Sequence, residues 1–124
     1  MDALVIDGMR YFPKVILDKN KNTFTFTGIS RPEDVDVLYT PIINWLKVYA
    51  SDPNPKTLIE FNFSYLNSAS MKKIYIILSI LEGLYVRKLD VKVKWFYELN
   101  DDTMKERAED ILSLLKIPFE IISV

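Results

Sequence analysis

The sequence predicts an α/β fold: a mixed, mostly parallel sheet with an N-terminal hairpin and three helices packed on it. Two observations carry this prediction. Several short segments are apolar or alternate between apolar and polar residues, as strands do, and longer stretches of helical periodicity separate them. Strands that alternate with helices form a sheet covered by helices, with right-handed crossovers between parallel strands. The length of 124 residues fits a single domain over residues 1–124.

The N-terminal third begins with a predicted hairpin. Residues 14–17 and 23–27 read as two short strands, and the polar segment 18–22 between them is typical of a turn. Gly28 is expected to end the second strand. Residues 3–6 are expected to form a short edge strand.

The first helix is predicted to follow the motif Ser-Arg-Pro-Glu, which runs from Ser30 to Glu33. This is a capping-box pattern, in which Ser30 caps the helix and Glu33 reaches back to it. Pro32 suits a first turn, where a missing N–H costs nothing. Pro41 interrupts the apolar pattern further on, so we expect a kink or two abutting helical pieces. The segment 51–55 (Ser-Asp-Pro-Asn-Pro) predicts the end of this element.

The rest of the chain alternates between strand and helix signals. Strands are predicted at residues 57–63, 90–97 and 118–122, and helices over residues 71–86 and from residues 100–102 onward. The helix at 71–86 is apolar well beyond one face. Such a helix is either covered by neighbouring elements or presents a dimer face, so the sequence leaves the oligomeric state open.

Composition removes several classes of function. The chain has no cysteine and no histidine, which removes disulfides, thiolate nucleophiles, Ser-His-Asp triads and the usual zinc sites. The formal net charge of -1 argues against binding to nucleic acid through phosphate neutralisation. The N-terminus lacks a basic leader, and the most apolar segment, 74–84, contains Ser79 and Glu82. We therefore expect a cytoplasmic protein without membrane insertion.

A cluster of acids in the last third suggests an alternative function. Such acids could form a magnesium site in a small carboxylate-based, metal-dependent enzyme. The alternative of a module that binds a small ligand would use a pocket lined by the aromatic residues Trp45, Tyr49, Trp95, Phe96 and Tyr97, although aromatic residues at such spacing are more often part of the core. A favourable helix start and a solvated helix face explain the acids more simply, so no metal and no cofactor are expected. The acids are Glu98, Asp101, Asp102, Glu106, Glu109 and Asp110.

The junction Tyr65-Leu66-Asn67-Ser68-Ala69-Ser70 lies between a predicted strand and a predicted helix. Small hydroxyl and amide residues at this place suit a helix N-cap, where a side-chain oxygen accepts a backbone N–H that has no partner. Residue chemistry alone therefore favours a structural cap. A regulatory role for the junction needs further support.

Several blocks of the sequence together resemble the SiaC family of bacterial regulatory phosphoproteins. The resemblance runs from about the first hairpin to the C-terminus, and the segment before Lys14 stays unassigned. The family fold is similar to that of STAS-type anti-sigma-factor antagonists. The blocks are residues 30–33 (SRPE), 39–49 (YTPIINWLKVY), 61–72 (FNFSYLNSASMK), 93–97 (VKWFY) and 101–104 (DDTM).

The resemblance implies a non-catalytic switch in c-di-GMP signalling and biofilm regulation. In the family a hydroxyl residue at the strand-to-helix junction is phosphorylated by a partner Ser/Thr kinase and restored by a phosphatase. A diguanylate cyclase is one implied effector. The matching residue is Ser68, where the family typically has threonine, and Ser70 is a second candidate. The implied partner-binding residues are Tyr65, Leu66, Asn67, Ser68, Ala69, Ser70 and Lys72.

Overall fold

Six strands form one sheet in which their order across the sheet is their order along the chain. The computed structural model describes all 124 residues. β1, β2 and β3 pair antiparallel, whereas β3 to β6 pair parallel, so the prediction of a mixed, mostly parallel sheet is confirmed. The strands are β1 (Leu4–Ile6), β2 (Lys14–Asp18), β3 (Thr23–Ser30), β4 (Lys56–Leu66), β5 (Asp90–Tyr97) and β6 (Phe119–Ser123).

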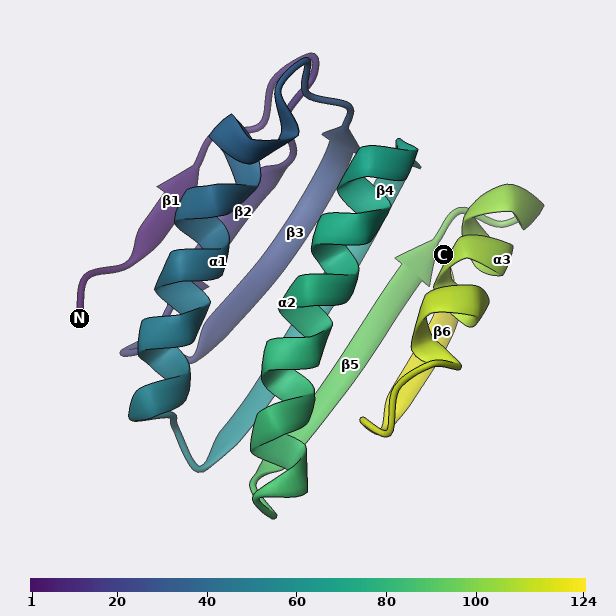
Figure 1. Cartoon of the computed structure of the whole chain (residues 1–124). Coiled ribbons are helices and arrows are strands. Elements are labelled where there is room, and N and C mark those ends of the chain that lie inside the picture. The colour runs from purple at the N-terminus through teal and green to yellow at the C-terminus, as the bar shows by residue number, and fades with distance from the viewer.

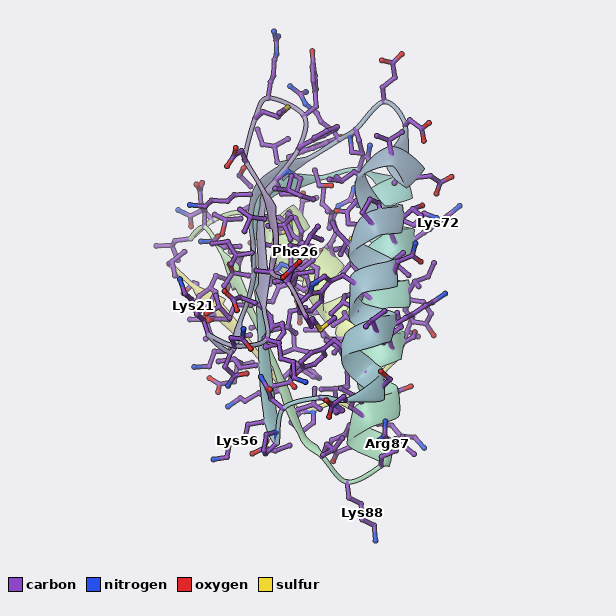
Figure 2. The ribbon with its side chains drawn as sticks, turned by 90° about the vertical axis from the view of Figure 1, so that its left-hand side faces the viewer. Lys21, Phe26, Lys56, Lys72, Arg87 and Lys88 are labelled. Carbon is purple, nitrogen blue, oxygen red and sulfur yellow. The ribbon has the colours of Figure 1, made fainter.

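The helices α1 (Val35–Ser51), α2 (Ser68–Val86) and α3 (Asp102–Leu112) cover one face of the sheet (Figure 1). Each parallel strand adds to the same side of the previous one, so right-handed crossovers place every helix on the same face. The side view shows two layers, with the helices on one side of the sheet (Figure 2). None of the three helices combines the length and the apolarity that a membrane crossing requires.

The hydrophobic core lies between the sheet and the helices. Alternate residues of the four central strands point into it, because successive side chains of a strand face opposite sides. Residues between them form the other face, where Glu60 and Lys94 lie side by side on β4 and β5. On the same face Lys92 pairs with Glu120 of the edge strand β6. The inward residues are Val15, Leu17, Phe24, Phe26, Thr57, Ile59, Phe61, Phe63, Val91, Val93 and Trp95.

The start of α1 differs from the prediction. Ser30 does not cap the helix; it is the last residue of β3 and is fully buried. The cap is Asp34, whose carboxylate accepts a hydrogen bond from the backbone N–H of Asp36 at 3.1 Å. Pro32 and Glu33 lie before the helix rather than in its first turn. Ser30 cannot cap the helix because it is buried at the end of β3, and Asp34, which follows the motif, provides the capping oxygen instead.

Gly28 does not end β3 but lies at an irregularity within it. Gly28 pairs with Phe63 and Ile29 pairs with Tyr65, so Ser64 is an extra residue in β4. Gly28 has a φ of 113°, a conformation that side-chain-bearing residues rarely adopt. The extra residue shifts the alternation of β4 by one position. This shift sets which side chains point outward at the end of β4.

Pro41 lies inside α1 without dividing it. The expectation of two helical pieces is wrong, since α1 is assigned as one helix over Val35–Ser51. Pro41 cannot donate to the carbonyl of Val37, one turn earlier. The Val37 side chain is 64% exposed, so water can reach this side of the helix and bond the free carbonyl.

The remaining elements match the prediction within a few residues. The edge strand at the N-terminus is present as Leu4–Ile6. β4 extends to Leu66, and α2 begins at Ser68 rather than Met71, so only Asn67 separates the two elements. The N-terminal segment is held to α1 by the indole N–H of Trp45, which donates to the carbonyl of Asp2 at 2.8 Å.

Candidate functional site

The candidate site is the one-residue junction between β4 and α2. Asn67 caps α2: its side-chain oxygen accepts the backbone N–H of Ser70 at 2.8 Å, and its carbonyl accepts that of Met71 at 3.0 Å. The backbone N–H of Asn67 donates to the carbonyl of Ser30 at 3.0 Å, which ties the junction to the end of β3. The cap predicted at this junction is therefore confirmed, and its residue is the asparagine.

Ser68 is the first residue of α2 and is exposed. Because Asn67 supplies the capping oxygen, the hydroxyl of Ser68 is not needed to start the helix. Its neighbour Ala69 is also exposed. The junction thus presents to solvent a serine hydroxyl that the fold does not use.

Ser70 lies two residues further on and has no exposed surface. Its hydroxyl oxygen lies 2.8 Å from that of Ser30 and 3.3 Å from the Ser30 carbonyl oxygen. The Ser30 hydroxyl also lies 2.6 Å from the phenol oxygen of Tyr39 on α1. A chain of three buried hydroxyls therefore joins α1, β3 and α2 beneath the exposed Ser68.

The direction of these hydrogen bonds follows from counting donors. The Ser30 carbonyl can only accept, so the Ser70 hydroxyl donates to it. The single Ser70 proton is then used, so Ser30 donates to Ser70, and Tyr39 in turn donates to Ser30. This arrangement uses every hydroxyl proton and makes every observed contact a hydrogen bond.

Tyr39 is held in its neutral form. Burial raises the pKa of its phenol from 10.0 to about 12, and the hydrogen bonds with Ser30 and Ser70 oppose the rise in pKa only in part. Removing a charged phenolate from water costs more than these hydroxyls return. The neutral phenol keeps the proton that it donates to Ser30.

The predicted partner-binding residues divide into an exposed group and a buried group. Tyr65, Ser68, Ala69 and Lys72 are exposed, and Asn67 is half-buried. Leu66 is buried at 1% and packs into the core, as Ser70 does. The shifted alternation of β4 explains why Tyr65 points outward while Leu66 points inward. The structure therefore leaves Tyr65, Ser68, Ala69 and Lys72 at the surface and removes Leu66 and Ser70 from it.

Two lysines follow the junction on α2 and differ in their partners. Lys73, in the second turn of α2, pairs with Asp36 in the first turn of α1 at 2.8 Å and so links the N-terminal parts of the two helices. Lys72 takes part in none of the three ion pairs of the structure and points away from the sheet (Figure 2). The first turn of α2 contains no acid, unlike those of α1 and α3. The first turn of α2 therefore contributes no carboxylate that would repel an anion, and Asp36 of α1 is paired with Lys73.

Sequence reasoning missed Ser30 and Tyr39 as partners of the junction. Ser30 was assigned to a helix cap, and Tyr39 is 31 positions from Ser70 in the printed chain. No periodic pattern links residues this far apart. The one usable signal was that both belong to blocks of the family resemblance.

The acids of the last third do not gather into a site. Asp101 caps α3 by accepting the backbone N–H of Met104 at 3.1 Å, and Asp102 occupies its first turn. No group of three or more acids is placed to hold a metal ion. The acids therefore act as helix-start residues and a solvated face, and their geometry gives no support to the alternative of a metal-dependent enzyme.

The largest surface hollow, about 450 Å³, lies away from the junction. It is formed by the β2–β3 turn and the start of β4, and Figure 2 shows Lys56 there at the opposite end from Lys72. Apart from Pro55 its lining residues are polar or charged, which makes it a poor site for a small molecule. Its lining residues are Lys19, Asn20, Asn22, Asn54, Pro55 and Lys56.

Comparison with known proteins gives a consistent result over nearly the whole chain. A family model described as SiaC family regulatory phosphoprotein matches residues 6–124. An uncharacterised protein of Pseudomonas aeruginosa strain UCBPP-PA14 is 26% identical over 121 residues, covering 98% of this chain and 96% of that protein.

Two solved structures share the fold closely. SiaC of Pseudomonas aeruginosa is 26% identical, covers 100% of both chains and superposes with a TM-score of 0.92. A second crystal structure contains the diguanylate cyclase SiaD of Pseudomonas aeruginosa in complex with its activator SiaC. It matches with the same TM-score of 0.92 and 26% identity, over 98% of this chain and 99% of that chain.

Proposed function

This chain belongs to the SiaC family of regulatory phosphoproteins, and we propose on that premise that it is a non-catalytic signalling switch. A partner Ser/Thr kinase phosphorylates Ser68, a phosphatase removes the phosphate, and the state of Ser68 controls binding to an effector. The proposed effector is a diguanylate cyclase, because a related SiaC is the activator of such an enzyme. The proposed location is the cytoplasm, because a kinase that uses ATP acts there.

The observation that carries the proposal is the exposed, unused hydroxyl of Ser68. The fold already has its cap in Asn67, so the hydroxyl can be modified without taking a hydrogen bond from the helix. Ser70 is fully buried and bonded to Ser30, so a kinase would have to unfold the start of α2 to reach it. These two facts favour Ser68 over Ser70 as the modified residue.

Phosphorylation would change the surface and leave the fold intact. A phosphate adds roughly -1.5 to -2 charges and three strong acceptor oxygens. At the start of α2 these oxygens meet free backbone N–H groups and the positive end of the helix dipole, with no acid in the first turn to repel them. Lys72, one turn further on, is free to pair with the phosphate.

The unmodified protein is the form that binds the effector. A neutral serine beside exposed apolar residues such as Tyr65 can be covered by a partner, whereas a phosphate must be stripped of water first. Covering a doubly charged group without new partners for its oxygens is costly, so the phosphate opposes docking.

Phosphopeptide mapping by mass spectrometry of the protein from its native cells tests the proposed modification. We expect one phosphate on the peptide that contains residues 65–72, located on Ser68, and its loss in the Ser68→Ala variant. A phosphate located on Ser70, or no phosphate under any growth condition, would contradict the proposal.

A further inference from the structure

A hollow of about 230 Å³ lies between α2 and α3, beginning one helical turn beyond Ser68. The two helices lie on the same face of the sheet and α3 flanks α2 (Figure 1). The hollow is smaller than the roughly 300–1,000 Å³ typical of small-molecule sites. Its lining residues are Met71, Lys72 and Tyr75 from α2 and Asp110, Ile111 and Leu114 from α3 and the turn after it.

The hollow has an apolar floor and a charged rim. Ile111 is only 4% exposed and forms part of the floor, whereas Leu114 is 69% exposed and Tyr75 is 40% exposed at its edge. Lys72 and Asp110 stand on opposite helices, and neither takes part in an ion pair. Large apolar side chains grouped around a hollow in this way mark an interaction surface rather than scattered surface residues.

We propose that this hollow is the docking site for the cyclase effector, an inference that rests on the proposed function. The occupant is one large apolar side chain of the cyclase, which fills the space between α2 and α3. A carboxylate beside it pairs with Lys72, and a cationic group on its other side pairs with Asp110. The opposite charges on the two rims fix the orientation in which such a segment can bind.

The position of Lys72 gives the switch a mechanism. Lys72 lines the hollow and is also four residues beyond Ser68, on the same side of α2. In the unmodified protein its ammonium group is available to the carboxylate of the cyclase. A phosphate on Ser68 takes the same ammonium group and repels the same carboxylate. Phosphorylation therefore closes one end of the docking site electrostatically.

Binding of the purified diguanylate cyclase of the same organism to two matched variants tests the inference. Leu114→Ser removes an apolar group from the edge of the hollow. Val86→Ser removes a similarly exposed apolar group, 65% exposed, from the last turn of α2, outside the hollow. We expect Leu114→Ser to raise the Kd roughly tenfold or more, and Val86→Ser to leave it within about twofold of wild type.

The outcomes separate this inference from the proposed function. Wild-type affinity in Leu114→Ser would overturn the docking site, and so would equal losses in both variants. If protein carrying phosphoserine at position 68 loses binding while Leu114→Ser does not, the docking site fails and the switch stands. Protein with phosphoserine 68 that binds like the unmodified form would overturn the switch itself.

If Leu114→Ser converts the free protein from a dimer to a monomer in sedimentation, the hollow is a self-association site and the proposal is wrong.

Discussion

Ser68 and Ser70 are two residues apart yet have opposite environments. An α-helix turns by about 100° per residue, so their side chains point to nearly opposite sides of α2. Ser68 faces solvent and Ser70 faces the core, where it bonds to Ser30. The geometry therefore separates the two hydroxyls into one available for chemistry and one that holds the helix in place.

The order of the buried hydroxyls predicts unequal effects of two substitutions. Ser30→Ala leaves the Tyr39 phenol without an acceptor in a dry site, which costs about 1–3 kcal/mol of the free energy of unfolding. Tyr39→Phe leaves Ser30 and Ser70 each with an acceptor for its proton, so its cost is expected to be smaller, below about 1 kcal/mol. Urea unfolding of both variants measures the difference. A Tyr39→Phe variant that is the less stable of the two would show that the assigned direction is wrong.

Tyr39 also predicts a loss of stability at high pH. Its pKa is about 12 in the folded protein and near 10.0 when unfolded, so the unfolded state loses its proton first as pH rises. The contribution is fully present below about pH 10 and is lost between about pH 10 and 12. At pH 11 the wild type should have lost about 1.4 kcal/mol relative to pH 8, beyond any loss in Tyr39→Phe. If the unfolding free energies of the wild type and Tyr39→Phe change with pH by the same amount, Tyr39 is not a buried, neutral phenol with a raised pKa.

At the scale of the element, α2 separates its cap from the residue that we propose is phosphorylated. Asn67 provides the capping oxygen, while Ser68 occupies the next position without contributing to the cap. Many helices use a serine as the cap itself, and a phosphate there would replace a structural hydrogen bond. The division of labour allows Ser68 to change its charge while the helix start stays in place.

This division predicts different stabilities for two neighbouring alanine variants. Asn67→Ala removes the hydrogen bond to Ser70 and should lower the free energy of unfolding by about 1 kcal/mol. Ser68→Ala removes only an exposed hydroxyl and should change it by less than about 0.5 kcal/mol. Thermal or urea unfolding of both variants provides the comparison. Equal destabilisation would mean that Ser68 shares the capping role.

The irregularity in β4 is the second element that builds the site. If β4 alternated strictly from Phe63 through Ser64 with no irregularity, Tyr65 would point into the core and Leu66 out to solvent. With it, Tyr65 is 49% exposed beside the junction and Leu66 is 1% exposed. The irregularity thus adds an aromatic side chain to the surface around Ser68.

At the scale of the whole molecule, local patterns predicted the elements but not their contacts. Alternation from Thr23 and the helical spacing after Asp34 identified β3 and α1, because burial of one face imposes those periods. The order of strands across the sheet depends on pairing between distant segments, which periodicity does not encode. The division into two helical pieces expected at Pro41 is not seen for a related reason: access of water to the free carbonyl depends on the packed structure.

The sequence predicted where the candidate site lies along the chain, but not which of its residues are buried. Small polar residues marked the junction as a helix start, and the family resemblance singled out Ser68 there. The sequence could not tell that Ser70 is buried, because its hydroxyl is satisfied by Ser30, 40 positions away. Contacts across α1, β3 and α2 decide which of two similar serines a kinase can reach.

The three helices cover one face of the sheet and bring the N-terminal parts of α1 and α2 together, where Lys73 pairs with Asp36. Lys72 lies on this helical side of the molecule and also lines the hollow between α2 and α3. A partner that contacts α2 near its start therefore meets Ser68 directly.

The measurement that tests the central claim most directly is the Kd of the purified cyclase for two forms of the protein, one with serine and one with phosphoserine at position 68. We predict that phosphoserine weakens binding roughly tenfold or more and that phosphatase treatment restores it. Equal Kd values for the two forms, with phosphorylation verified by mass, would contradict the account.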